Sequence, residues 1–309
     1  MYSTFFGNFS CKGGDLMKIK TPEHSTRRKT GVGVAASSRK ALIVGVLLAL
    51  FSTLIAGCAE RNTVKIDEFE DLGMDGVKIS IGNPEHVPAG RYAVEILSNL
   101  NKINPELANK VKENIVSKDI NVRAVLDKVV SKEVDAGFVY RTDAYTEKDK
   151  VRIIEIPEEI NVIPEYPIAV LKNSDDSDAA SEFVKFVLSR EGQEILASYG
   201  FVSPIENPEP YTPNEIDDTI VVYAAASLTD AFEEIANEFE SITGCKVKTL
   251  FASSGSLRQK IEGGAVGGES GADVYASASL KHMKILKKEG FVTDYSIFAK
   301  NKMVVITPK

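Results

Sequence analysis

Residues 219–230 read Thr219-Ile-Val-Val-Tyr-Ala-Ala-Ala-Ser-Leu-Thr-Asp230, and this stretch joins an apolar run directly to the start of a helix. Its β-branched and aromatic residues predict a buried strand over Thr219–Ala224. The Ser-Leu-Thr-Asp that follows is typical of a helix start, so we predict a helix over Leu228–Ile242 with Ser227 as its N-cap. A strand that leads straight into a helix is the repeating unit of an α/β fold.

The same alternation extends in both directions from this stretch and predicts an α/β fold class for the chain. Further predicted strands are Val77–Ile81, Ala136–Tyr140, Val151–Ile156, Tyr166–Leu171, Lys246–Phe251 and Asp273–Ala276. Further predicted helices are Ala89–Leu100, Val122–Val130, Ala179–Tyr199 and Leu257–Glu262.

The chain ends in a strand, Lys302–Lys309, and because a strand needs a partner we predict that it pairs with Tyr166–Leu171. Residues 203–218 contain four Pro and form a linker between two halves.

The first 57 residues are typical of a secretion signal. Basic residues end at Lys40, and 17 uncharged residues then lead to Cys58. The stretch Leu54-Ile-Ala-Gly-Cys58 resembles the lipobox of secreted lipoproteins, which predicts removal of residues 1–57 and lipidation of the cysteine. A single transmembrane helix is the alternative, although 17 apolar residues are short for a bilayer. In both cases the body lies outside the cytoplasm, tethered to the membrane through residues 58–63.

The charge of the body limits what it can bind. The chain carries a net charge of −7, but eight Lys or Arg and only two acidic residues precede Cys58, which leaves about −13 on the remainder. So acidic a body argues against nucleic acid, whose phosphates need a basic surface. Any bound anion must instead be held by local dipoles, against the overall field.

Cysteine and histidine usage argues against two further kinds of site. Cys11 lies in the predicted signal and Cys58 is predicted to carry lipid, so Cys245 has no partner for an intramolecular disulfide. The three histidines are scattered at positions 24, 86 and 282, which argues against a zinc site and against a His-dependent catalytic triad.

Four predicted helix starts have small or polar residues in or next to their first turn, and they lie at Ala89, Val122, Ser227 and Ser254. A helix N-terminus offers free N–H donors and a partial positive charge, so four of them together can bind an anion without a cationic side chain. Taken singly, each Ser is explained by the capping of its own helix. Three arginines lie within the first turns of these helices, where we expect solvated surface positions: Arg91, Arg123 and Arg258.

Longer motifs surround the same positions. They are Val222-Tyr-Ala-Ala-Ala-Ser227-Leu-Thr-Asp-Ala-Phe, Phe251-Ala-Ser-Ser254-Gly-Ser-Leu, Ala272-Asp-Val-Tyr-Ala-Ser-Ala278, Gly82-Asn-Pro-Glu-His-Val-Pro-Ala89-Gly-Arg-Tyr-Ala, Asn121-Val122-Arg-Ala-Val-Leu and Asp135-Ala-Gly-Phe-Val-Tyr140-Arg-Thr-Asp-Ala. With shorter matches they cover nearly all of residues 64–309, and they resemble the extracytoplasmic molybdate-binding proteins of ABC importers, the ModA type. The resemblance implies a type II periplasmic-binding-protein fold, in which two α/β lobes are joined by hinge strands.

The order of the motifs differs from that of the resembling family, whose chains look like residues 219–309 followed by residues 64–202. The resemblance therefore implies a circular permutation in which the linker joins the old termini, with the new ends at a surface crossover. The implied parts are a lobe of residues 64–165 equivalent to the family's second lobe, a hinge strand of residues 166–171, a lobe of residues 172–300 equivalent to the family's first lobe and containing the linker 203–218, and a hinge strand of residues 301–309. A gene rearrangement that produces a non-native fusion is the alternative.

For function, the resemblance implies a monomeric binding protein that captures molybdate or tungstate and delivers it to the permease and ATPase subunits of an ABC importer. The implied donors are the hydroxyl and backbone N–H of Ser227 and Ser254, the backbone N–H of Ala89 and Val122, and the phenol O–H of Tyr140. The metal is held as its oxyanion, so no residue binds it directly, and neither a cofactor nor enzymatic activity is expected. Two alternatives are a site for another tetrahedral oxyanion such as sulfate, and a hydrolase with Ser227 or Ser254 as nucleophile.

Overall fold

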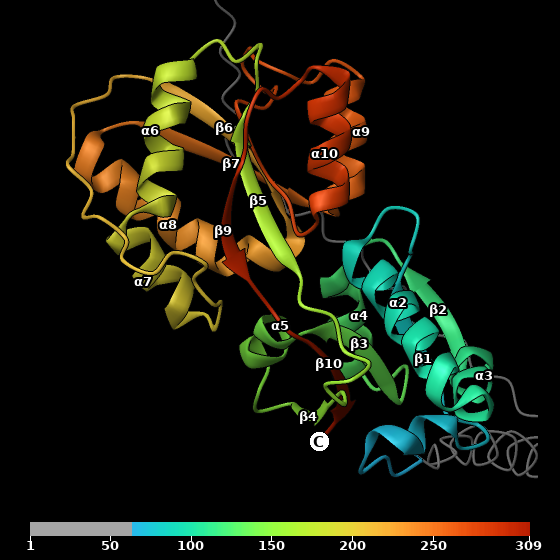
Figure 1. The fold of residues 1–309 in the computed structure, drawn as a ribbon. Helices are drawn as coiled ribbons and strands as arrows, with labels where there is room; N and C mark the ends of the chain where they lie inside the picture. Colours follow the sequence, from blue (N-terminus) through green and yellow to red (C-terminus); the bar gives the residue numbers. More distant parts are fainter. Residues whose placement is uncertain (1–63) are drawn as a thin grey trace, which may run out of the picture. The chain divides into compact units, whose positions relative to one another are not determined.

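The protein is described by a computed structural model over residues 64–309, which belong to one compact unit (Figure 1). The predicted signal, the tether and the lipidation site at Cys58 lie outside the described residues. Within residues 64–309, no helix is long and apolar enough to span a bilayer. These residues form two five-stranded sheets covered by helices, so the predicted α/β class is confirmed.

The first sheet is built from residues 79–155 together with the last strand of the chain. Its strands, in spatial order, are β2 (Ile115–Asp119), β1 (Ile79–Gly82), β3 (Ala136–Tyr140), β10 (Met303–Pro308) and β4 (Val151–Glu155). Strand β1 is parallel to β2 and β3, whereas β10 runs antiparallel to β3 and β4. Around this sheet lie η1 (Phe69–Gly73), α2 (Pro88–Ile103), α3 (Pro105–Glu113), α4 (Val122–Val130) and α5 (Arg141–Thr146). We call this group of elements the first lobe.

The second sheet contains, in spatial order, β7 (Lys246–Ala252), β6 (Thr219–Ala225), β8 (Val274–Ala276), β5 (Glu165–Val170) and β9 (Ser296–Lys300). Its helical elements are α6 (Ser177–Leu188), α7 (Arg190–Ser198), η2 (Ala226–Leu228), α8 (Thr229–Thr243), α9 (Ser254–Glu262) and α10 (Leu280–Glu289). Figure 1 shows α6, α7 and α8 on one side of the sheet and α9 and α10 on the other. We call this group the second lobe.

Each face of the second sheet has its own apolar core. On one face Phe183 of α6 packs edge-on against Phe232 and Phe239 of α8, with ring centroids 6.2 and 5.3 Å apart. On the other face Leu257 of α9 and Met283 of α10 are fully buried. Because helices cover both faces, β6 can be a continuous apolar run rather than an alternating one.

The predicted pairing of Tyr166–Leu171 with Lys302–Lys309 is wrong. Strand β5 pairs with β8 and β9 in the second sheet, whereas β10 lies between β3 and β4 in the first. All residues of β10 from Met303 to Thr307 are buried. A run that is buried on both faces needs a neighbour on each side and a covered sheet, and the interior position in the first sheet provides both.

The single helix predicted over Ala179–Tyr199 is also wrong, because the chain breaks at Ser189 into α6 and α7. The Ser189 hydroxyl accepts a hydrogen bond from the N–H of Gly192 and so caps α7. The two helices approach so closely that a Cβ on Gly192 would lie 2.2 Å from the carbonyl oxygen of Phe186. A small residue at this position therefore permits the sharp turn.

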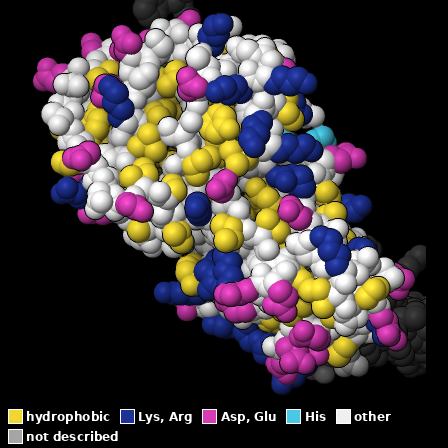
Figure 2. Space-filling view, in the orientation of Figure 1, with side chains coloured by type: hydrophobic (Ala, Val, Ile, Leu, Met, Phe, Trp, Pro, Cys, Tyr) yellow, Lys and Arg dark blue, Asp and Glu magenta, His cyan; other side chains and the backbone are white. Residues whose placement is uncertain are grey.

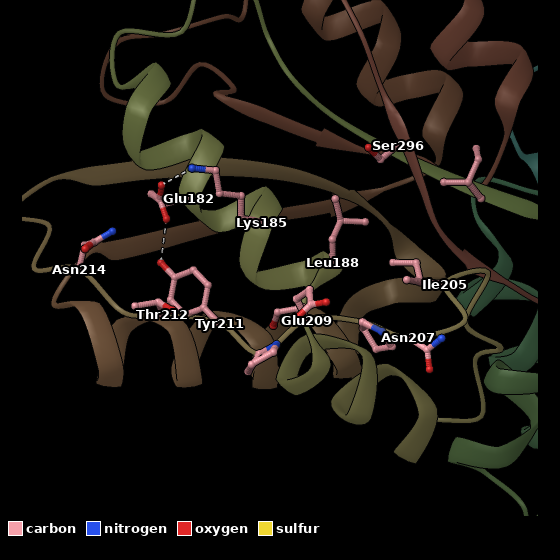
Figure 3. Close-up of a pocket in the computed structure, with 14 residues that line it drawn as sticks. Glu182, Lys185, Leu188, Ile205, Asn207, Glu209, Tyr211, Thr212, Asn214 and Ser296 are labelled. Atoms are coloured by element: carbon pink, nitrogen blue, oxygen red, sulfur yellow. Dashed lines mark hydrogen bonds and ion pairs between the residues drawn. The ribbon is translucent and has the colours of Figure 1, made fainter.

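Residues 203–218, the predicted linker, contain no helix or strand and join α7 to β6 within the second lobe. The linker is nevertheless packed onto the second lobe, since the ring of Tyr211 lies 5.3 Å from that of Phe186. The hydroxyl of Tyr211 donates to Glu182 of α6, which also pairs with Lys185 (Figure 3).

Candidate functional site

Ser254 is the first residue of α9 and is fully buried. The cap of this helix is its neighbour Ser253, whose hydroxyl accepts from the N–H of Ser256 at 3.2 Å. The Ser254 hydroxyl is therefore not used by its own helix, and it accepts a hydrogen bond of 3.0 Å from the N–H of Ala278. One of its two lone pairs is occupied by a fixed donor, and its proton is available to another group.

Ser227 lies inside the short 3-10 turn η2, between β6 and α8. The predicted N-cap role of Ser227 is wrong, because the N-cap of α8 is the apolar Leu228. The extra turn moves the start of the helix past the serine. The Ser227 hydroxyl instead lies 3.2 Å from the hydroxyl of Tyr166 on β5, and both residues are buried.

Ala89 and Val122 lie in the first turns of α2 and α4 and are buried. Backbone N–H groups in a first turn have no acceptor four residues earlier in the helix, so both can donate outward. The side chain of Asn121 caps α4 by accepting from the N–H of Ala124, which leaves the N–H of Val122 for another acceptor. The start of α2 is pressed against β1, since a Cβ on Gly90 would lie 1.8 Å from the Gly82 oxygen.

Tyr140 ends β3 and is 1% exposed. Its hydroxyl has no hydrogen-bond partner among residues 64–309. Burial raises the pKa of Tyr140 well above its ordinary value, so the phenol remains protonated and can donate. Its ring packs between Tyr92, at 6.4 Å, and Tyr166, at 5.7 Å, which holds the hydroxyl in place.

Contacts between the lobes bring these five residues together. The N–H of Gly255, next to Ser254, donates to the carbonyl of His86 at 2.9 Å, just before α2. The hydroxyl of Tyr92 on α2 donates to the carbonyl of Ala278, whose own N–H binds Ser254. Helix α4 packs against η2, the turn that contains Ser227, and Arg123 in the first turn of α4 is bound to Asp230, three residues after Ser227.

The expectation that Arg91, Arg123 and Arg258 are solvated is wrong. The side chain of Arg123 is only 23% exposed and is bound to the carboxylates of Asp143 in the first lobe and Asp230 in the second. Arg91 donates to the hydroxyl of Ser279 across the lobes, and Arg258 pairs with Glu262 within α9. Charges removed from water need partners, and the carboxylates near Arg123 and Arg258 supply them.

Asp143 is fully buried, and desolvation raises its pKa to about 6 although Arg123 opposes the shift. The Nε of Arg123 lies 2.8 Å from a carboxylate oxygen of Asp143, but the contact is misaligned for a hydrogen bond. The contact is therefore mainly an ion pair, and the arginine charge is taken up by carboxylates. This leaves neutral O–H and N–H groups as the donors at the five positions.

Two other surface features contain none of these donors. The exposed lysines of α10 form a basic strip, seen in Figure 2: Lys281, Lys284, Lys287 and Lys288. A hollow of about 790 Å³ lies between α6 and the linker, lined among others by Glu182, Leu188 and Tyr211 (Figure 3). Among residues 64–309 there is no group of three His, Cys, Asp or Glu side chains that could hold a metal ion.

Sequence reasoning missed two residues in contact with this cluster. Tyr166 was placed only as a strand residue, and Asn301 only as part of the last strand. Both are buried, and the side-chain amide of Asn301 donates to the Tyr166 hydroxyl at 3.2 Å. The signal available in the sequence was a polar residue between two apolar runs, Ile297 to Ala299 and Met303 to Ile306.

Several known proteins are similar in sequence to this chain. The profile of the family described as bacterial extracellular solute-binding protein matches residues 34–202 and 220–309. The molybdate-binding protein ModA of Mycobacterium tuberculosis H37Rv is 34% identical over 50% of this chain and 55% of its own. YvgL of Bacillus subtilis, named as a candidate ABC transporter substrate-binding lipoprotein, is 38% identical over 45% of this chain and 50% of its own.

A more distant relative is the phosphate-binding protein PstS 2 of Streptococcus agalactiae strain 2603 V/R, which is 24% identical over 37% of this chain and 40% of its own. The chain thus spans about half the length of the curated relatives it matches. The family profile covers well over half of the residues, in the two stretches that flank the linker, and the fold has the two α/β lobes expected of such proteins. The chain therefore belongs to the family of bacterial extracellular solute-binding proteins.

Proposed function

We propose that this protein captures a fully deprotonated tetrahedral oxyanion, molybdate or tungstate, and delivers it to the permease and ATPase subunits of an ABC importer. The observation that carries the proposal is the convergence of buried neutral donors. Tyr140 has a buried hydroxyl without a partner among residues 64–309, and Ser227 and Ser254 are buried residues whose hydroxyls do not cap a helix. Ala89 and Val122 add N–H groups from the first turns of two helices.

Neutral donors suit a dianion that carries no proton. Each oxygen of such an anion only accepts hydrogen bonds, so a site made of O–H and N–H groups satisfies it without an acceptor. The ends of α2, α4 and α9 add partial positive charge, which compensates for the acidic body. The relatives named for molybdate support this choice of ligand.

Other oxyanions compete for the same chemistry. Sulfate also carries no proton at neutral pH, and it is smaller than molybdate, so the spacing of the donors discriminates between them. Phosphate, the ligand in the name of the more distant relative, keeps a proton near neutral pH and needs an acceptor. We therefore place molybdate and tungstate first, sulfate second and phosphate last.

Hydrolysis by either serine is the weaker proposal. A serine nucleophile needs an adjacent base to remove its proton. The neighbour of the Ser227 hydroxyl is a tyrosine and that of the Ser254 hydroxyl is a backbone N–H, and both are donors or weak acids. Turnover of a phosphate or sulfate ester that is abolished in a Ser227→Ala variant would support the hydrolase instead.

Isothermal titration calorimetry tests the proposed ligand. The purified protein is titrated separately with molybdate, tungstate, sulfate and phosphate at neutral pH. We expect saturable binding of molybdate and tungstate, weaker binding of sulfate and the weakest binding of phosphate. Tighter binding of phosphate than of molybdate contradicts the proposal.

The order of the chain also belongs to this proposal. We propose that the protein is a circular permutant in which residues 64–165 and 172–300 supply most of the two lobes, while residues 166–171 complete the second sheet and residues 301–309 complete the first. Two observations support it: the family profile matches two stretches that flank the linker, and each curated relative matches only about half of the chain. A permuted chain aligns with an unpermuted relative over one half at a time.

The location follows from the same proposal. We propose that the protein acts outside the cytoplasm as a monomer, anchored through lipid on Cys58. The relative named as a lipoprotein supports the anchor. Metabolic labelling with a radioactive fatty acid tests it, because a Cys58→Ala variant should lose the label.

A further inference from the structure

Tyr166 connects the predicted anion site to the crossing between the lobes. Its buried hydroxyl lies 3.2 Å from the hydroxyl of Ser227 and 3.2 Å from the amide nitrogen of Asn301. Asn301 lies between β9 of the second lobe and β10 of the first. The amide of Asn301 also donates to the hydroxyl of Thr142 on α5, so it contacts both lobes at once.

The direction of the hydrogen bond at Asn301 is determined by its backbone neighbour. Its side-chain oxygen accepts from the N–H of Lys302 at 2.8 Å, and a backbone N–H can only donate. The amide group therefore cannot be flipped, and its nitrogen faces Thr142 and Tyr166. It follows that the oxygen of Tyr166 is an acceptor in its bond with Asn301.

The direction of the next bond follows from burial. Tyr166 is 0% exposed, and a buried hydroxyl proton without an acceptor costs free energy. Burial also raises the pKa of Tyr166 well above its ordinary value, so the proton is present. The hydroxyl of Ser227 is the neighbour that can accept it, which makes Ser227 an acceptor from Tyr166 and leaves the Ser227 proton free for another group.

We propose that Asn301 and Tyr166 are positioning residues that hold Ser227 as a donor toward the bound anion and thereby set the preference for oxyanions that carry no proton. This inference rests on the proposed function. The Ser254 hydroxyl is also held by a fixed donor, since the N–H of Ala278 occupies one of its two lone pairs. A protonated oxyanion needs an acceptor, and both serine hydroxyls are held in an arrangement that favours donation of their protons to the anion.

A double-mutant cycle tests whether Tyr166 acts through Ser227. The full chain is titrated with molybdate as wild type, Tyr166→Phe, Ser227→Ala and the double variant. We expect Tyr166→Phe to weaken binding about threefold to tenfold in the wild type and to have no further effect when Ser227 is already replaced. Tyr211→Phe is the matched control, since it removes a phenol on the linker, and its affinity should equal that of wild type.

Anion preference gives a second measurement, which a purely structural role would not change. Without the Tyr166 hydroxyl, the Ser227 hydroxyl is no longer held with its proton toward the anion and can rotate to accept a hydrogen bond, so the affinity for phosphate relative to molybdate should rise. Asn301→Asp should produce the same rise, because a carboxylate oxygen in place of the amide nitrogen takes the Tyr166 proton away from Ser227. This second variant covers the case in which Tyr166→Phe fails to fold.

Two results overturn the inference alone. One is that Tyr166→Phe costs the same molybdate affinity in the wild type as in Ser227→Ala. The other is that the preference between phosphate and molybdate is unchanged in both Tyr166→Phe and Asn301→Asp. A wild-type chain that binds neither molybdate nor tungstate contradicts the proposed function and the inference together. The wild-type titration therefore separates the two failures.

Discussion

The hydroxyl of Ser254 lies at a helix start but does not cap the helix. Its neighbour Ser253 caps α9, so the Ser254 hydroxyl is bound only by the N–H of Ala278. In isolation, a serine at a helix start is explained by capping. The neighbouring serine removes that explanation, and this makes Ser254 a better ligand candidate than the sequence alone indicates.

Replacement of Ser254 by Ala should weaken binding of molybdate by roughly 1 to 3 kcal/mol, because a hydrogen bond to a charged group is lost. The change also leaves the N–H of Ala278 buried without its acceptor, so thermal stability should fall slightly. Calorimetric titration measures the affinity. Ser256→Ala, on the same helix, is the control, and an equal loss in both variants would show that Ser254 has no special role.

Asp143 makes stability depend on pH. Its pKa is raised from 3.8 to about 6 by burial, so between these values the folded state keeps a proton that the unfolded state releases. The stability of the wild type relative to an Asp143→Asn variant should therefore fall as pH rises from about 4 to about 6, and then stay level. The linked change is about 3 kcal/mol. Urea unfolding of both proteins across this pH range measures it, and a difference that rises with pH contradicts the assignment.

Helix α9 contributes more than its serines, because its second residue touches the other lobe. The N–H of Gly255 donates to the carbonyl of His86, and a Cβ at this glycine would lie 2.4 Å from that oxygen. The start of α9 and the segment before α2 therefore approach more closely than any side chain at position 255 allows. This contact links the helix that carries Ser254 to the helix that carries Ala89.

Gly255→Ala should separate these two segments. We expect the affinity for molybdate to fall about tenfold or more, through loss of the Gly255–His86 hydrogen bond and a steric clash. Thermal stability should change less, because alanine is the better helix former. Gly263→Ala at the other end of α9 is the matched control, since its Cβ would lie 3.3 Å from the Gln259 oxygen. Unchanged affinity in Gly255→Ala would show that the segments tolerate a wider spacing.

The position at which a helix ends can also depend on contacts that the apolar pattern does not reveal. The predicted helix over Val122–Val130 and the strand over Ala136–Tyr140 have the predicted bounds. The pattern over Ala179–Tyr199 is equally helical, yet the chain breaks at Ser189 where Gly192 meets the carbonyl of Phe186. Apolar spacing predicts that a segment is helical, but it does not locate a turn between two helices that continue the same pattern.

At the scale of the molecule, the two ends of the described chain meet on one strand. Arg152 of β4 donates to the carbonyl of Ile66, and in the sheet it is paired in register with Thr307 of β10. The start and the end of the body therefore lie on the same side of the first lobe. This is the arrangement that a permuted chain requires if its original order can be restored by a short connection.

A reordered chain tests the permutation. Lys309 is joined to Val64 by a short Gly/Ser linker, and new termini are opened at Asn214 within the natural linker. We expect the reordered protein to fold and to bind molybdate as tightly as the natural one, because the sheets and donors are the same. Calorimetry and thermal unfolding measure both properties. A protein that folds but does not bind would show that the natural linker contributes to the site.

Besides the five residues that the family resemblance implies for the anion, the sequence by itself determined the α/β class and most strands and helices. These follow from the period of apolar residues and from residue types at helix starts, which depend on near neighbours in the chain. The tertiary structure decided that β10 joins the first sheet, that Arg123 is bound by two carboxylates, and that the hydroxyl of Ser227 lies against that of Tyr166. Each of these depends on partners far away in the sequence, so no local pattern encodes it.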